Sequence, residues 1–364
     1  MKIGEPRSPF IYLTMKNIHF YRIVAAVLII ASVLCSCEKG ERLNKYSTYS
    51  MDYFDTVITI TGYERSQDEF DRIAEEMLSL FGEYHRLYTI YHRFEGMENL
   101  CTINELVDGQ HRTVTVDRRI IDMLLYAREM YDLTDGIMNV AMGSVLSLWH
   151  DYRTVGKDNP DKASLPPMDL LEKAAEHTDI GKMIIDADSS TVTLTDPLMK
   201  LDVGAIAKGY ATERVAETFE KKGITGYILN VGGNVRTLGG KGDGTPWTVG
   251  IENPDGEEYL AYLELNGQSV VTSGSYQRFY YVDGKPYHHI IHPDTLMPAT
   301  GYLSVSVICV DSGKADSLST ALFCLSREDG KRLIESIPDA EAMWVTEDGK
   351  KTFSSGWDQY TKND

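Results

Sequence analysis

The feature that most constrains the fold is a succession of short β-rich segments in the second half of the chain. Helical patterns stand in groups between these segments instead of alternating with single strands. The expected strands cover residues 183–185, 192–194, 227–231, 247–251, 259–265, 269–272, 279–282, 288–291, 303–310 and 342–345. Strands that follow one another as hairpins, with grouped helices, predict an α+β fold of antiparallel sheets with packed helices, and not a doubly wound parallel sheet.

Amphipathic helices are predicted where apolar residues recur every three or four positions. The expected helices cover residues 67–91, 118–133, 169–178, 206–222, 315–325 and 328–337, and a β-branched strand covers residues 57–61. We expect the two long helices of the first half to pack in the core and to carry no site. The Lys, Asp and Pro residues between Asp151 and Pro167 indicate a surface connection.

Composition excludes several classes of protein. A chain of 364 residues with 43% hydrophobic residues is long enough to bury a large core, which argues against disorder and a coiled coil. A net charge of -18 repels phosphate backbones, so nucleic-acid binding is not expected. The five cysteines have no CxxC spacing, which indicates neither a zinc knuckle nor a dense disulfide scaffold.

The N-terminus reads as a secretion signal. Basic residues precede an apolar run from Ile23 to Leu34, which is too short to span a bilayer comfortably. The run ends in Leu34-Cys35-Ser36-Cys37, which resembles the lipobox of bacterial lipoproteins, with Cys37 as the lipidated residue. Cys35 fits this pattern less well, and an uncleaved membrane anchor is the alternative. Met15 is an alternative start of translation.

This interpretation predicts the domain organisation. Residues 1–36 form a lipoprotein signal peptide, residues 37–49 a flexible tether and residues 50–360 the folded domain. We therefore expect a lipid-anchored protein on the extracytoplasmic, periplasmic side of a bacterial membrane.

Two glycine-containing segments suggest close contact with a ligand. Residues 201–210 (LDVGAIAKGY) run from a strand into the start of a helix, where an anion is favoured and Lys208 adds a positive charge. A tight turn with a solvated Lys208 is the alternative, and the segment is not a P-loop. Residues 230–234 (NVGGN) end a strand in two glycines, which is more often a turn or a bulge.

Histidines gather at residues 288–292, where three of the nine in the chain lie. Strand alternation would place His288 and His292 on one face and His289 on the other. A zinc site lacks the remaining ligands, so one histidine acting as a general base is the more economical interpretation.

Asp316 and Thr320 are spaced to lie on one face of a helix. A carboxylate and a hydroxyl so placed suit Mg²⁺, whose other ligands would be a backbone carbonyl, water and substrate phosphate. The alternative is that Asp316 only stabilises the first turn of its helix.

Taken together, these segments resemble one known family. LDVGAIAKGYA, NVGGN, TSGSYQRFYYVDGKPYHHIIHP and KADSLSTAL, in this order and spacing, closely resemble the bacterial FAD:protein FMN transferases, the ApbE-like flavin transferases. Upstream, residues 54–56, Tyr91 with Asn104, and residues 135–139 with 148–149 resemble further segments of that family. The resemblance covers nearly the whole chain after the signal.

The resemblance implies a T-fold-like α+β architecture, with FAD bound in a cleft of the 50–360 domain and Mg²⁺ at the pyrophosphate. The metal ligands carried over by position are Ala205 through its carbonyl, Asp316 and Thr320. The carried-over FAD contacts are Phe54, Tyr91, Ile137, Met138, Asn139, Asp202, Lys208 and Ile291, and His289 is the catalytic base.

The implied reaction is Mg²⁺-dependent transfer of FMN from FAD to a Thr or Ser hydroxyl of a target protein, with release of AMP. The implied partners are membrane or extracytoplasmic redox proteins that accept the flavin. Two alternatives stay open: a Mg²⁺-dependent FAD pyrophosphatase that gives FMN and AMP, and a non-catalytic flavin-binding lipoprotein.

This chain departs from the family pattern at three places. His292 replaces an Asp and Leu296 replaces a Gly in the H-x-I-D-P-x-T-G-x-P run, and Phe54-Asp55 replaces a more usual Met-Gly. A loop that elsewhere has Gly must therefore accommodate the side chain of Leu296, which is expected to alter the fit of FAD or the path of the acceptor.

Overall fold

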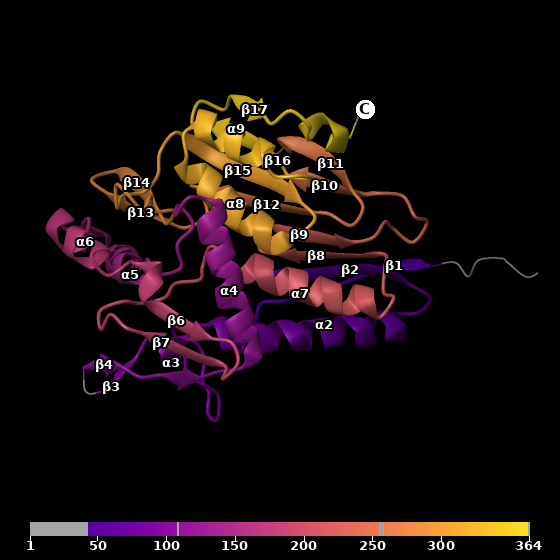
Figure 1. Cartoon of the computed structure of the whole chain (residues 1–364). Coiled ribbons are helices and arrows are strands. Elements are labelled where there is room, and N and C mark those ends of the chain that lie inside the picture. The colour runs from indigo at the N-terminus through magenta and orange to yellow at the C-terminus, as the bar shows by residue number, and fades with distance from the viewer. Residues whose placement is uncertain (1–42, 108, 255, 257, 363–364) are drawn as a thin grey trace, which may run out of the picture. The chain divides into compact units, whose positions relative to one another are not determined.

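The computed structural model describes residues 43–107, 109–254, 256 and 258–362. The described residues from Lys45 onward form one compact unit. Its centre is an eight-stranded sheet (Figure 1). In sheet order, the strands are β1 (Asn44–Ser50), β2 (Ile58–Glu64), β8 (Tyr227–Val231), β9 (Asn234–Leu238), β12 (Ser269–Gly274), β15 (Tyr302–Cys309), β16 (Glu341–Thr346) and β17 (Lys351–Phe353). From β2 to β17, every neighbouring pair is antiparallel.

Smaller sheets and helices surround this sheet. The small sheets pair β10 (Trp247–Ile251) with β11 (Ala261–Leu265), β13 (Phe279–Val282) with β14 (Lys285–His288), β3 (Leu106–Val107) with β4 (Gln110–His111), and β7 (Thr191–Leu194) with both β5 (Val114–Thr115) and β6 (Met183–Asp186). The α-helices are α2 (Gln67–Tyr88), α3 (Leu100–Ile103), α4 (Arg118–Leu133), α5 (Gly143–Asp158), α6 (Met168–Ala175), α7 (Ala207–Lys221), α8 (Ser312–Cys324) and α9 (Arg327–Glu335). Short 3-10 helices cover Pro160–Lys162, Ile180–Lys182 and Trp357–Tyr360. The predicted α+β class with antiparallel sheets is confirmed.

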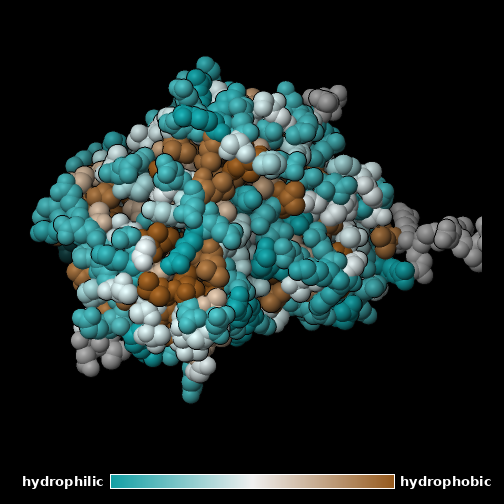
Figure 2. Space-filling view, viewed as in Figure 1, coloured by the Kyte–Doolittle hydropathy of each residue, from teal (hydrophilic) through white to brown (hydrophobic). Residues whose placement is uncertain are grey.

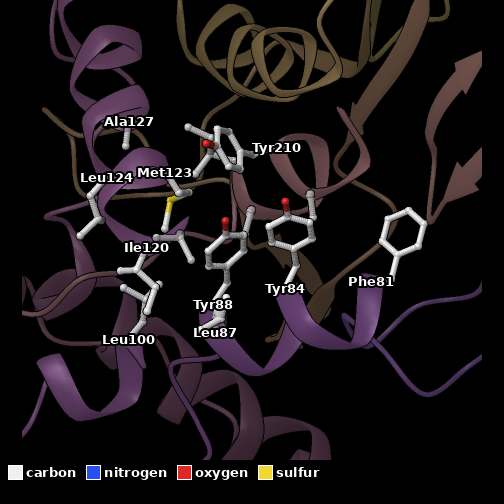
Figure 3. Close-up of a cluster of buried hydrophobic side chains, with 14 of the residues drawn as sticks. Phe81, Tyr84, Leu87, Tyr88, Leu100, Ile120, Met123, Leu124, Ala127 and Tyr210 are labelled. Carbon is white, nitrogen blue, oxygen red and sulfur yellow. The ribbon is translucent and has the colours of Figure 1, made fainter. Parts of the chain in front are cut away.

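Helices α2, α7 and α8 lie side by side over one face of the large sheet (Figure 1). Aromatic and aliphatic side chains fill the space where α2 and α7 meet α4. Figure 3 shows Tyr84 and Tyr88 of α2 beside Tyr210 of α7, and the rings of Tyr88 and Tyr210 are 6.2 Å apart between centroids. Burial of this apolar surface fixes the starts of α7 and α8 relative to the end of α2.

The opposite face of the large sheet packs against the β10–β11 hairpin. Trp247 and Ile251 of β10 are buried against Val270 of β12 and Met343 of β16, and Trp357 closes the cluster. Both faces of the central strands are therefore covered, which explains their nearly continuous apolar runs.

Most expected elements form, and their errors have local causes. Helix α4 has the predicted bounds, but the surface connection predicted from Asp151 to Pro167 is wrong, because α5 continues to Asp158. Helix α5 buries Val145 and Trp149 on one side only, so its outward face has the polar composition of a loop. The strand predicted for residues 288–291 is wrong beyond His288, where β14 ends.

The NVGGN segment is a hairpin turn between β8 and β9. Gly232 and Gly233 have φ of 57° and 91°, as a two-residue turn with both residues in the left-handed region requires. Strand β9 follows at once and was not predicted, and the strand expected before Lys208 is absent, since Lys200 makes only an isolated bridge to Met142.

The surface and the cysteines add two observations. Figure 2 shows one face on which hydrophilic side chains predominate and hydrophobic ones gather near the centre. No helix within the described residues is long and apolar enough to cross a membrane. Cys101, Cys309 and Cys324 are free thiols. The predicted signal peptide and Cys37 lie outside the described residues.

Candidate functional site

A cavity of about 710 Å³ opens where the start of α7 and the middle of α8 approach β8, β9 and β12. Every predicted site residue in the described part of the chain lines it. These residues are Phe54, Tyr91, Ile137, Met138, Asn139, Asp202, Ala205, Lys208, His289, Ile291, Asp316 and Thr320. The fold thus gathers residues from six separate stretches of sequence around one space, which has the size of a small-molecule site.

Asp316 is held by a close approach of two helices. Its side chain is 4% exposed, and its Oδ2 accepts a hydrogen bond of 2.8 Å from the backbone N–H of Gly209. A Cβ at Gly209 would lie 2.4 Å from the Cβ of Asp316, so only glycine allows α7 and α8 to come this close. One turn further along α8, the Thr320 hydroxyl lies 3.4 Å from the Ser273 hydroxyl of β12.

The chemistry around Asp316 and Thr320 fits a hard cation. Within the described residues, Asp316 has no ion pair with Lys or Arg, although a buried carboxylate needs a positive partner. Thr320 and Ala205 line the same cavity and offer a hydroxyl and a backbone carbonyl oxygen. In the described part of the chain, no three His, Cys, Asp or Glu side chains form a metal cluster, so a metal here would depend on carbonyl, hydroxyl and ligand oxygens, as Mg²⁺ commonly does.

His289 differs from the two histidines beside it. His288 donates from Nε2 to the carbonyl of Ala299 (2.8 Å) and accepts from Ile290 N–H at Nδ1, so it is neutral and structural. His292 Nδ1 accepts from the N–H of Asp294. The Nδ1 of His289 is buried and has no hydrogen-bond partner within the described residues.

Burial, together with the charges of the nearby Arg278 and Arg153 guanidinium groups, lowers the pKa of His289 to about 3. His289 is therefore an uncharged proton acceptor at neutral pH. The role of base predicted for it requires this protonation state. The alternation argument that separated it from His288 was wrong, because the strand stops before it.

A polar chain crosses the opposite wall of the cavity. The Tyr91 hydroxyl lies 3.1 Å from Nδ1 of His150, and Nε2 of His150 lies 3.8 Å from Oδ2 of Asp202. Asp202 also accepts from the N–H of Gly204, which shapes the turn before α7. Asn104 fixes the same turn, because its side-chain amide exchanges two hydrogen bonds with the backbone of Leu201.

Two consecutive residues at the rim have left-handed backbone conformations. Phe54 and Asp55 have φ of 58° and 50°, at the place where the sequence departs from Met-Gly. The N–H of Phe54 donates to Nδ1 of His85, and the two rings meet edge to face at 5.5 Å. Strained backbone held in this way by tertiary contacts is common at functional sites.

Some residues singled out in the sequence make contacts within the protein. The Asn139 amide donates to the carbonyl of Thr178 and accepts from the N–H of Ala141, so it shapes the loop that carries Met138. Leu296 also lies in the left-handed region, with φ of 59°, and its side chain is 7% exposed. Its carbonyl accepts from the indole N–H of Trp149, so the replacement of Gly is accommodated by burial against α5.

Sequence reasoning missed several residues of the cavity. His85 and Tyr88 end α2, His150 and Arg153 lie on α5, and Arg278 follows β12. Arg153 was missed because its segment, from Asp151 to Pro167, was assigned to a surface connection, and His150 lies directly before that segment. Arg278 stands within the quoted TSGSYQRF segment, but nothing local distinguishes it from a solvated arginine.

Comparison with known proteins agrees with this fold. Residues 54–344 match the model of the ApbE family. The chain is similar to the FAD:protein FMN transferase of Klebsiella pneumoniae (34% identity; 86% of this chain and 93% of the relative) and to that of Treponema pallidum (30% identity; 93% and 94%). The crystal structure of the ApbE protein from Thermotoga maritima superposes with a TM-score of 0.76 at 28% identity, over 88% of this chain and 100% of that one.

The fold and the cavity define an α+β protein with a candidate small-molecule site. The chain belongs to the ApbE family. The fold of the flavin transferase ApbE from Vibrio cholerae is also similar, with a TM-score of 0.72 over 87% of this chain and 99% of that one.

Proposed function

We propose that this chain is an FAD:protein FMN transferase that moves FMN from FAD to a Thr or Ser hydroxyl of a target protein and releases AMP. One observation carries the proposal: a single cavity joins Asp316, a buried carboxylate that has no cationic partner among the described residues, to Lys208 and to the uncharged His289. The names of the relatives support the same reaction.

The residues of the cavity have distinct roles in this reaction. Lys208, at the start of α7, attracts the negative pyrophosphate together with the N-terminus of its helix. The acceptor hydroxyl attacks the FMN-side phosphorus, the bond from that phosphorus to the AMP oxygen breaks, and His289 takes the hydroxyl proton. Tyr91, His150 and Asp202 form a wall that orients the substrate.

Asp316, Thr320 and the carbonyl of Ala205 are the residues that would hold Mg²⁺. Bound there, the metal would supply positive charge at the pyrophosphate. The hydrogen bond from Gly209 keeps one carboxylate oxygen of Asp316 in place, and the other has no protein partner among the described residues.

We also propose that Cys37 carries a lipid and anchors the domain on the extracytoplasmic side of a bacterial membrane. The apolar run that ends in Leu34-Cys35-Ser36-Cys37 supports this proposal. The acceptor proteins would then be membrane or extracytoplasmic redox proteins that the tethered domain can reach.

The reaction is tested by incubating the protein with FAD, MgCl₂ and a flavin-accepting protein that has an exposed Thr-containing segment. Intact-protein mass spectrometry should show a mass gain of one esterified FMN, and EDTA should abolish it. Asp316→Asn should lose the metal-dependent reaction, while Asp329→Asn, an exposed carboxylate of α9, should keep it as the matched control.

Product analysis separates the alternatives. Free FMN and AMP without a modified acceptor would indicate a pyrophosphatase, and unchanged FAD that remains bound would indicate a flavin-binding protein. Full activity of the Asp316→Asn protein would remove the metal site from the proposal.

A further inference from the structure

Two cations of the cavity have no role in the reaction described so far. Arg153 projects from α5 and Arg278 from the connection between β12 and β13, and both line the cavity. In the described part of the chain, neither guanidinium group makes a hydrogen bond or an ion pair, whereas Arg119 and Arg236 each contact carboxylates. Arg153 is half-buried and Arg278 is exposed. An arginine of a cavity without a carboxylate partner is a natural site for an anion from outside the protein.

The two guanidinium groups act on the same surroundings. Each lowers the pKa of His289, and each lowers that of His150. They also repel each other, since Arg278 lowers the pKa of Arg153, which burial lowers first. Two like charges therefore line the same cavity as the uncharged His289 and act on each other, and this arrangement becomes favourable when an anion binds to both.

Asp202 is the carboxylate that acts on Arg153, and it does not neutralise the pair of arginines. Asp202 attracts Arg153, but its Oδ1 accepts from the N–H of Gly204 and its Oδ2 lies 3.8 Å from His150. Asp316 lies at the α7–α8 contact and is bonded to Gly209. The positive charge of the two arginines is thus available to a ligand.

We propose that Arg153 and Arg278 form an anion subsite that binds the phosphoryl group on the FMN side of FAD. This inference rests on the proposed function. In an in-line displacement, the base lies on the side of the attacking hydroxyl and the leaving AMP oxygen on the opposite side of the phosphorus. Groups that surround His289 therefore face the phosphorus under attack, and a guanidinium fork matches its non-bridging oxygens.

In this assignment, the cationic groups of the cavity bind different parts of FAD. Lys208 and the proposed Mg²⁺ ligands Asp316 and Thr320 act on the pyrophosphate from the α7–α8 side. Arg153 and Arg278 bind the transferred phosphoryl group from the side of His289. Both arginines stay protonated throughout, the new bond joins the acceptor oxygen to phosphorus, and the proton goes to His289.

The experiment compares binding of FMN and riboflavin to the full chain by isothermal titration in EDTA. The two ligands differ only by the phosphate, so their affinity ratio isolates its contribution. Arg153→Gln and Arg278→Gln should each reduce this ratio about tenfold to a hundredfold, as expected for a hydrogen-bonded charge, and should leave riboflavin affinity unchanged. Arg327→Gln, an arginine at the start of α9 outside the cavity, is the matched control.

Three outcomes overturn the proposal. If FMN and riboflavin weaken equally, the arginines only support the fold of the site. If the variants instead reduce the preference for AMP over adenosine, the pair serves the leaving group. If the wild type binds no flavin at all, the proposed function fails with it, whereas an unchanged ratio in a flavin-binding wild type removes the subsite alone.

Discussion

Replacing Gly209 by Ala tests whether the close approach of α7 and α8 places the metal-binding carboxylate. The added Cβ would lie 2.4 Å from both the Cβ of Asp316 and the carbonyl oxygen of Ser312, about 1 Å short of the 3.4 Å at which ordinary contact begins. The helices must separate, and such overpacking costs about 1–3 kcal/mol. The hydrogen bond from the Gly209 N–H to Asp316 would lengthen at the same time.

We expect two effects that can be measured separately. The melting temperature should fall by roughly 2–4 °C for each kcal/mol lost, and the Mg²⁺ concentration for half-maximal FMN transfer should rise at least about tenfold as Asp316 moves. Gly330→Ala in α9 is the matched control, because its Cβ would meet the end of the Leu322 side chain at 3.3 Å and the Trp344 ring at 3.5 Å, without a severe overlap. A Gly209→Ala protein with the melting temperature and Mg²⁺ requirement of the wild type would refute this reasoning.

Three further predictions follow from single residues. Because the pKa of His289 is lowered to about 3, its basic form persists down to that pH, and kcat/KM should show no ionisation near 6.5; a fall in kcat/KM below pH 6.5 that disappears in His289→Ala would contradict this. Leu296→Gly relieves about 1–2 kcal/mol of left-handed strain but loses a buried side chain worth about 2–5 kcal/mol, so urea unfolding should show net destabilisation, and a more stable variant would count against the packing argument. Cys37→Ser should move the protein from the membrane fraction to the soluble fraction of the host, and continued sedimentation with membranes would support an uncleaved anchor.

The elements that the sequence predicts well are those with a local cause. Helix α4 begins where Asp117 accepts a hydrogen bond from Arg119 and shows the expected apolar spacing to Leu133. Strand β8 is recognisable because its apolar residues stop at a pair of glycines. Strand β9 was missed because its one charged residue, Arg236, suggests a surface, whereas it is buried in an ion pair with Glu213 of α7.

Helix α5 was also missed, for a different reason. Its outward side chains have the composition of a loop, and only the tertiary cluster around Trp149 reveals that the other face is buried. The sequence also suggested a strand at residues 288–291, but the backbone N–H of Ile290 bonds to the His288 ring, and the chain leaves the hairpin there. Local patterns could not reveal these partners, which lie elsewhere in the chain.

The candidate site was predictable through motifs and not through geometry. Residues such as Lys208 and Asp316 stand in distinctive segments, and the fold brings those segments to one cavity. Their assigned roles stay predictions. Arg153 and Arg278 have no such signal, because an arginine in the sequence looks the same whether it is solvated or lacks a partner inside a cavity.

The electrostatics of the cavity connect binding to catalysis. Without substrate, His289 is a weak base, because burial and the charges of Arg278, Arg153 and Lys208 all disfavour its protonation. An anionic phosphate bound among these cations offsets their effect on the imidazole, so the pKa of His289 should rise toward its ordinary value. A base is most effective when its pKa approaches the working pH. The same cations that attract FAD to a protein of net charge -18 therefore keep the base weak until the phosphate has arrived.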